Sequence, residues 1–331
     1  MKAALALASF SGALISKEPI PGQITVANSS QYDAANLSTE LTSYIAGQPA
    51  PEIEQFLDLM FPSVEAGRFF QFQKHDDESF ITETDDSDIR PVGASFKRVE
   101  YRGSKQTGNV LNKGLCYRQD HDAIMRRPDG SLPTGWENAI VRNLKNRLLR
   151  AELLRGIALL NAGSTNANAT FDATTNPDGL LRAACRLSLT GKGVRPTHLM
   201  MGDVAWQLRQ DAYEAAGRAN HAMASHAEYD EAELARYLGL KTVRREDSLY
   251  QTKKGAGKTD ILASLAYIYG AEDSGMIDDP SNIKRIWSPT DDGPKFGVYV
   301  DQKRKYTDII VEHYSVFISP ITSGIRKLTI S

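Results

Sequence analysis

Cysteine is nearly absent from this sequence: only Cys116 and Cys185 occur among 331 residues. Disulfide-stapled secreted domains and thiolate zinc sites both need several cysteines at close, regular spacing. The two cysteines here are far apart, so neither class fits. We expect two reduced thiols and a cytosolic setting for folding.

A long hydrophobic run is also missing, since no stretch approaches the roughly 18 apolar residues that cross a bilayer. The N-terminal segment MKAALALASFSGALIS has a lysine followed by an alanine-rich run, as a weak secretory signal would. Ser9, Ser11 and Gly12 interrupt that run. We expect an uncleaved N-terminal arm and no membrane partner.

The chain lacks an excess of either charge, with 39 basic and 41 acidic residues and a net charge of −2. A protein that binds nucleic acid over its whole surface would be strongly basic, so any such contact must be local. The hydrophobic content of 41% and the charged content of 24% are those of an ordinary globular protein.

Recognisable catalytic motifs are missing as well. Gly255–Thr259 (GAGKT) ends like a phosphate-binding loop, but Thr252 stands where its first glycine should be, so we expect a basic loop. His221 and His226 are five residues apart, which does not match the zinc-binding H-E-x-x-H spacing. Asp76–Asp88 contains seven carboxylates without the regular spacing of a calcium loop. We predict no catalytic, cofactor-binding or metal-binding residue.

The strongest signal present is a long helix over 137–162. Apolar residues recur there at the spacing of one helix face: Ile140, Val141, Leu144, Leu148, Leu149, Leu153, Ile157 and Leu160. Basic residues fill the opposite side: Arg142, Lys145, Arg147, Arg150 and Arg155. Gly163 is the predicted stop. Such a helix is about 37 Å long. It can be a packed core helix, a nucleic-acid-binding helix or the backbone of an assembly.

A second feature is a predicted hairpin ahead of that helix. Residues 68–73 alternate as a strand should, and 95–101 are the expected return strand. The acidic segment 76–88 forms the tip. An isolated two-stranded hairpin is marginal in water, so we expect it to rest on a neighbouring molecule. A solvated acidic loop is the alternative.

The remaining segments indicate an α+β protein. Short helices are predicted at 52–60 and 180–187, and a strand, turn and helix at 195–219. His198 and His313 fall in strand-like segments and are expected to be packed. Two strands close the chain, at 308–318 and 325–331, where β-branched and aromatic residues are dense.

Taken in order, these elements resemble the tailed-phage major capsid protein family, which has the Hong Kong 97-type fold. The likeness covers the layout of essentially the whole chain. Locally it rests on FQFQK at 70–74, RPVGA at 90–94, KRVEYRGSKQTGNVLNKGL at 97–115, RPTHLMMGDVAWQLR at 195–209 and EHYSVFISPITSGIRKLTIS at 312–331.

That resemblance implies a division of the chain. Residues 1–48 would be an N-terminal arm and 66–105 an extended β-hairpin, the E-loop. Residues 49–65 and 106–175 would form the peripheral (P) domain, with 137–162 as its spine helix. Residues 176–300 would form the axial (A) domain, and 301–331 would return to the P domain as C-terminal strands.

The resemblance also implies a function. The chain would assemble as pentamers and hexamers into an icosahedral shell around double-stranded DNA, in a virion built in the host cytoplasm. Expected partners are further copies, a scaffold, a portal and decoration proteins, with DNA touched non-specifically. Three alternatives stay open: an encapsulin-type shell holding cargo enzymes, a cytosolic enzyme with an unrecognised site, and a DNA-binding protein using the basic helix.

Overall fold

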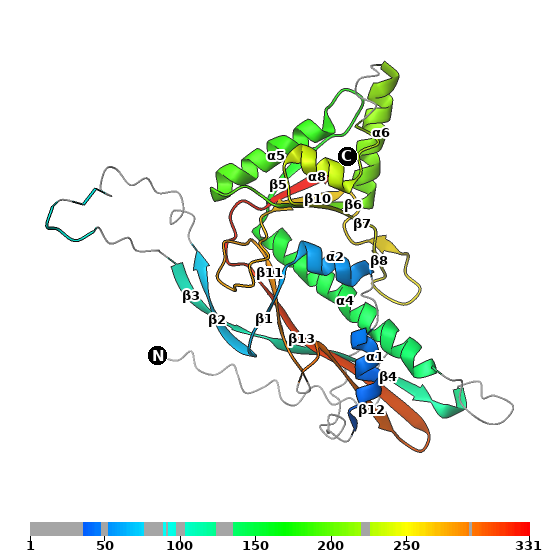
Figure 1. Ribbon diagram of the computed structural model, residues 1–331. Coiled ribbons are helices and arrows are strands. Elements are labelled where there is room, and N and C mark those ends of the chain that lie inside the picture. Colours follow the sequence, from blue (N-terminus) through cyan, green and yellow to red (C-terminus); the bar gives the residue numbers. More distant parts are fainter. Residues whose placement is uncertain are drawn as a thin grey trace, which may run out of the picture.

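The structure is a computed structural model that describes residues 36–47, 52–75, 89–90, 92–96, 103–123, 135–219, 226–290 and 293–331. Two five-stranded sheets form a lower and an upper body, and one long helix runs between them (Figure 1). A two-stranded hairpin projects to one side.

The sheet of the lower body is built around its longest strand, β13 (Tyr306–Ile318). Four strands complete it: β1 (Ser63–Glu65), β4 (Leu111–Asp120), β11 (Lys284–Ser288) and β12 (Phe296–Gln302). β4, β11 and β12 pair with β13 antiparallel, and β1 pairs with β11 in parallel. A short 3-10 helix, η3 (His121–Ala123), follows β4.

Helix α4 (Trp136–Gly163) lies across this sheet and against the short helices α1 (Thr39–Gly47) and α2 (Glu52–Met60). Its apolar stripe, which includes Val141, Leu149 and Leu153, is completely or almost completely buried. A 3.6-residue period keeps such positions on one face, so the helix predicted over 137–162 is confirmed. The predicted helix at 52–60 is α2.

The upper sheet has the order β5-β14-β10-β6-β7. Its strands are β5 (Thr165–Ala169), β6 (His198–Gly202), β7 (Thr242–Glu246), β10 (Leu265–Tyr269) and β14 (Arg326–Ile330). Helices α5 (Pro177–Lys192), α6 (Asp203–Ala219) and α8 (Glu231–Leu238) cover one face (Figure 1).

Both faces of the upper sheet are buried at β6, which explains the continuous apolar character of this strand. Leu199 and Met201 face the core under the helices, whereas Met200 belongs to the core around α4 and α2. Tyr269 of β10 stacks on Phe61, with 6.4 Å between the ring centres, and donates a hydrogen bond to the carbonyl of Met60 at 2.9 Å. The two bodies therefore share one hydrophobic core.

The projecting hairpin corrects one prediction. β2 (Phe69–His75) pairs with β3 (Gly103–Asn109), so 95–101 is the wrong return strand. β3 reads GSKQTGN and has no apolar alternation to reveal it. Its Gly108 is required by packing, because a Cβ there would lie 2.3 Å from Cζ of Phe70. The predicted tip, 76–88, lies outside the described residues.

The ends and faces of α4 also differ from the prediction. Gly163 does not take the left-handed conformation; it is the last helical residue, and Ser164 caps the helix in an extended conformation. Ser164 Oγ donates to the carbonyl of Asn161 at 2.9 Å, which satisfies that end of the helix. Lys145 is buried, 2.8 Å from Glu54, and so is not on the outer basic face.

Each sheet joins segments that are far apart in the sequence. β11 and β12 lie in the lower sheet with β1 and β4, and β14 joins the upper sheet beside β10. Strand partners are set by contacts far apart in sequence, which local patterns do not report. The segment before 36 lies outside the described residues, while α1 packs its Leu41 and Ile45 into the lower core.

Candidate assembly surfaces

The most highly charged part of the lower core lies where α4 crosses β13. Glu152 of α4 accepts a hydrogen bond from Nε2 of His313 at 3.0 Å and another from Oγ of Ser315. Nζ of Lys113 on β4 lies 3.2 Å from the same carboxylate oxygen. Arg285 on β11 lies 3.8 Å from the other one. One helix is therefore tied to three strands.

The charges of this cluster keep Glu152 ionised. Burial alone would raise the pKa of its carboxyl, but the hydrogen bond and charge of His313, with Lys113 and Arg285, hold that pKa well below its usual range. Burial lowers the pKa of Lys113, although the charge of Glu152 opposes this.

This cluster contains a serine, a histidine and a carboxylate, but it is not arranged for nucleophilic catalysis. Glu152 stands between Ser315 and His313 and bonds to both, whereas a serine nucleophile must bond to its histidine base. The three residues are each 1% exposed, so no substrate can reach them. The cluster fixes the position of α4 on the sheet.

A similar buried ion pair fixes the helices of the upper body. Arg209 of α6 donates to both carboxylate oxygens of Asp178 on α5, at 2.6 and 3.0 Å, and both side chains are fully buried. His226 lies 3.2 Å from Asp178 and stacks on Tyr213, so it serves packing. His221 lies outside the described residues.

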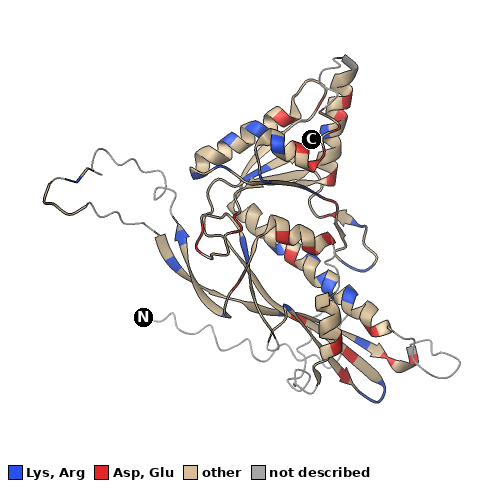
Figure 2. Ribbon diagram, viewed as in Figure 1, with Lys and Arg blue, Asp and Glu red and all other residues tan. Residues whose placement is uncertain are grey.

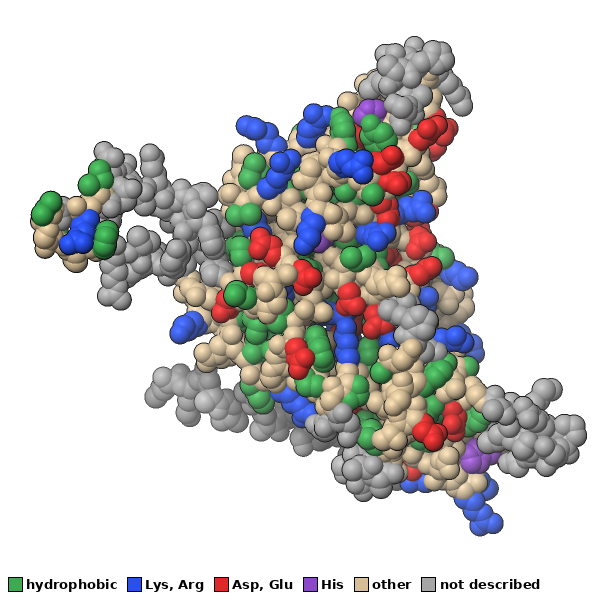
Figure 3. Space-filling model, viewed as in Figure 1, with side chains coloured by type: hydrophobic (Ala, Val, Ile, Leu, Met, Phe, Trp, Pro, Cys, Tyr) green, Lys and Arg blue, Asp and Glu red, His purple; other side chains and the backbone are tan. Residues whose placement is uncertain are grey.

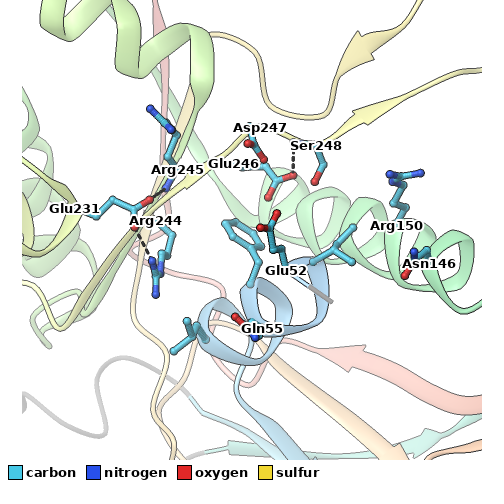
Figure 4. Close-up of a pocket in the computed structure, with 13 residues that line it drawn as sticks. Glu52, Gln55, Asn146, Arg150, Glu231, Arg244, Arg245, Glu246, Asp247 and Ser248 are labelled. Atoms are coloured by element: carbon cyan, nitrogen blue, oxygen red, sulfur yellow. Dashed lines mark hydrogen bonds and ion pairs between the residues drawn. The ribbon is translucent and has the colours of Figure 1, made fainter. Parts of the chain in front are cut away.

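A cavity of about 580 Å³ opens between the two bodies. In Figure 4, α2 lies at its base, Asn146 and Arg150 on α4 stand on one side, and β7 stands on the other. Arg244 pairs with Glu231 at 2.6 Å, and the backbone N–H of Arg245 donates to the same carboxylate at 2.7 Å.

The side chains that line this cleft are mainly charged residues from both bodies. Burial raises the pKa of Glu246, although hydrogen bonds from Ser248 oppose the shift. The described lining residues include no histidine and no cysteine, and their charges largely neutralise one another. The cleft separates two bodies that meet through α2 and α4.

The other motif and histidines considered in the sequence analysis lie in a loop or in the core. Gly255–Thr259 lies in the loop that joins β8 (Leu249–Tyr250) to β9 (Thr259–Asp260), and its last residue begins β9. This agrees with the predicted basic loop. His198 is buried as predicted; its Nε2 lies 3.1 Å from the carbonyl of Leu59, and burial lowers its pKa to about 4. His313 is buried too. Among the described residues, no group of three or more His, Cys, Asp or Glu side chains could hold a metal.

The surface features most suggestive of a function are on the hairpin. Phe70 and Phe72 pack with Val64, Ile286 and Ile318 near its base. Phe69 is 82% exposed, and Ile89, Val92 and Phe96, which lie between β2 and β3 in the sequence, are all at least 69% exposed. A single chain leaves this apolar surface in water, which is typical of a surface that meets a partner. Figure 3 shows hydrophobic side chains in the coloured part of the loop at the left, away from the rest of the surface.

Comparison with known proteins identifies the fold. No family model matches the chain. No curated protein matches it either. Among solved structures, a phage-related protein from Bordetella bronchiseptica RB50 aligns over 88% of this chain and 96% of its own, with a TM-score of 0.62 and 12% identity. A structure from Gordonia phage Cozz aligns over 96% of this chain and 98% of its own, with a TM-score of 0.52 and 10% identity.

A capsid structure of the cyanophage P-SCSP1u also aligns, over 95% of this chain and 92% of its own, with 9% identity and a lower TM-score of 0.49. The two stronger alignments extend over nearly the full length of both chains, so they concern the whole architecture and not one shared motif. The chain has the Hong Kong 97-type α+β fold of phage capsid proteins.

Proposed function

We propose that this chain is the major capsid protein of a tailed bacteriophage, which assembles as pentamers and hexamers into a closed icosahedral shell around double-stranded DNA. The observation that carries the proposal is the projecting hairpin on this fold. Its exposed apolar residues Phe69, Ile89, Val92 and Phe96 are not buried within one chain, and assembly with further copies would bury them.

The proposal assigns roles to the two bodies. The lower body, with α4 as spine helix, would be the peripheral domain, and the upper body the axial domain near the symmetry axes. The hairpin would be the E-loop. Arg142, Arg147, Arg150 and Arg155 are exposed on α4 and would give sequence-independent contacts to packaged DNA phosphates.

Partners and location follow from the same proposal. A scaffold, a portal and decoration proteins would act with the shell, which would be built in the host cytoplasm and released in virions. The described helices include none with both the length and the apolar composition to cross a membrane. An encapsulin-type shell would have the same fold and differ in its cargo. Because the buried Ser315–Glu152–His313 cluster is closed to substrates, we do not assign an enzymatic activity.

Electron microscopy of the purified full chain, with and without co-expressed neighbouring genes, tests the proposal. We expect closed angular shells, or sheets of pentamers and hexamers. Shells that package DNA support the phage head, and small shells that enclose an enzyme support the encapsulin. A uniform dimer or tetramer under every condition would contradict both shell functions.

A further inference from the structure

The upper body carries an arginine-lined groove along α5. Its volume is about 490 Å³, and Arg182, Arg186 and Arg195 line it above an apolar floor that includes Cys185 and Leu238. No carboxylate is among the described residues that line this groove. Three guanidinium groups around one cavity, without a local counter-charge, favour an anionic partner.

The contacts of the three arginines leave this positive charge uncompensated. Arg195 donates to the carbonyl of Leu238 at 3.3 Å, and the guanidinium of Arg182 lies 4.9 Å from the ring centre of Tyr237. These partners are neutral. Arg186 is exposed and makes no hydrogen bond or ion pair with any residue in the described part of the chain. The groove is therefore held open and positively charged.

The exposed face of α6 has the opposite character. Its outward positions are Val204, Gln207, Asp211 and Glu214, three or four residues apart. Neither Asp211 nor Glu214 forms an ion pair with a described residue. Arg209, the basic residue within this stretch of α6, points inward to Asp178. The described part of this face is thus acidic.

The two surfaces lie on opposite sides of the upper body. Figure 1 shows α5 on one side and α6 on the other, and Figure 2 shows basic residues along α5 and acidic residues along α6. Each surface also exposes apolar side chains: Leu180 and Leu187 on α5, and Val204 on α6. One chain cannot bring its own two surfaces together, but two copies can.

We propose that the acidic face of α6 in one copy, through Asp211 and Glu214, docks on the arginine-lined groove of α5 in the next copy. A contact between two different surfaces of the same chain repeats from copy to copy and closes into a ring when the rotation allows. Opposite charges then fix which surfaces meet, and the apolar residues beside them add burial. This inference rests on the proposed self-assembly and names the surfaces that form its rings.

Two charge-reversed chains test the contact. Arg182→Glu/Arg186→Glu makes the groove acidic, and Asp211→Arg/Glu214→Arg makes the α6 face basic. Each variant alone places like charges against each other at every contact, so we expect at least an about ten-fold loss of assembled shells at low salt. Arg236→Glu, at an exposed site on α8 outside the groove, is the matched control and should assemble as the wild type does.

Mixing supplies the decisive measurement. In an alternating ring of the two variants every contact again joins opposite charges, so a one-to-one mixture should recover hexamers that neither variant forms alone. Sedimentation velocity and electron microscopy report the rings, and unaltered melting temperatures show that both variants fold. If either folded variant assembles as the wild type does, or the mixture recovers nothing, the contact is wrong.

A DNA-binding assay distinguishes the proposed contact from a groove that binds nucleic acid. If reversing the arginines abolishes DNA binding by the subunit while reversing the acids leaves assembly unchanged, the groove binds nucleic acid and the proposed contact is overturned. If the wild type forms shells and both charge-reversed variants assemble equally well, this inference is wrong but the proposed function stands. The absence of wild-type shells under all conditions would remove the proposed function itself.

Discussion

Glu152 of α4 and His313 of β13 are joined by a 3.0 Å hydrogen bond, although 161 positions separate them in the sequence and each is almost completely buried. Both lie at the centre of a cluster that also includes Lys113 and Arg285. A buried ion cluster of this kind does not by itself stabilise a protein, but the loss of one member leaves the others unpaired. The position of α4 therefore depends on every charge in the cluster.

The first prediction concerns Glu152→Gln. The amide keeps the shape of the side chain and removes its charge, so Lys113 and Arg285 lose a counter-charge inside the core. We expect a loss of about 3–5 kcal/mol of stability, seen as a lower melting temperature of the unassembled chain. Arg147→Gln on the exposed face of the same helix is the control and should change stability by less than about 0.5 kcal/mol. Equal melting of the two variants would show that the cluster is not structurally important.

The second prediction is a loss of stability in mild acid that depends on His198. Burial lowers the pKa of this histidine from 6.5 to about 4. Between these two values the unfolded chain binds a proton that the folded chain does not, so stability falls as the pH is lowered from about 6.5 to 4. At about 1.36 kcal/mol per pH unit the full effect is about 3 kcal/mol.

His198→Gln removes this titration and keeps a donor for the carbonyl of Leu59. The variant should lose less stability than the wild type between pH 7 and pH 4.5, measured as the change in melting temperature. His121→Gln changes a histidine near the surface, whose Nε2 lies 2.8 Å from Oγ1 of Thr307, and serves as control. Parallel pH profiles for the wild type and His198→Gln would refute the prediction.

The contribution of Glu152 to stability changes in a lower pH range than that of His198. Its folded pKa lies well below the ordinary value of 4.5, so its contribution is fully present above about 4.5 and decreases as the pH falls further. The two groups can therefore be distinguished. His198 governs the range above about pH 4, and Glu152 contributes progressively below 4.5.

The sequence predicted the long helix and the strand-rich C-terminus because both depend on local periodicity. It could not show the buried charges. A glutamate or lysine among apolar residues is assigned to the solvent side of a helix, and Lys145 was placed there wrongly. Its burial depends on Glu54, which the short helix α2 brings alongside. Nothing local identifies such a partner.

The hairpin and the last strand show a second limit. β3 has a polar, glycine-containing sequence, and its pairing with β2 depends on backbone hydrogen bonds and on the space that Gly108 leaves for Phe70. The strand at the C-terminus was predicted correctly, but not its place between β5 and β10. Local sequence patterns predict which segments are strands, while neighbours in a sheet are chosen by distant residues.

The third prediction tests the glycine in the hairpin. Gly108→Ala places a Cβ against the ring of Phe70, which must move away from β3 or force the strands apart. We expect faster hydrogen exchange of the β2 and β3 amides and a destabilisation of about 1–3 kcal/mol, confined to the hairpin. Gly257→Ala is the matched control, because its added Cβ meets no atom within 4 Å. Unchanged exchange in Gly108→Ala would show that Phe70 adapts without cost.

The fourth prediction concerns the buried pair of Lys145 and Glu54, whose Nζ and Oε2 atoms are 2.8 Å apart. Lys145→Met alone strands the glutamate charge in the core between α2 and α4, and should cost about 3–5 kcal/mol. The double variant Glu54→Leu/Lys145→Met replaces both charges with apolar groups of similar length. Since no charge then has to be desolvated, the stability of the double variant should return to within about 1 kcal/mol of the wild type or exceed it.

Thermal melts of the wild type, both single variants and the double variant form a complete double-mutant cycle. A double variant as unstable as the sum of its single variants would mean that the two charges do not act as a pair, and that each is stabilised separately by its own surroundings.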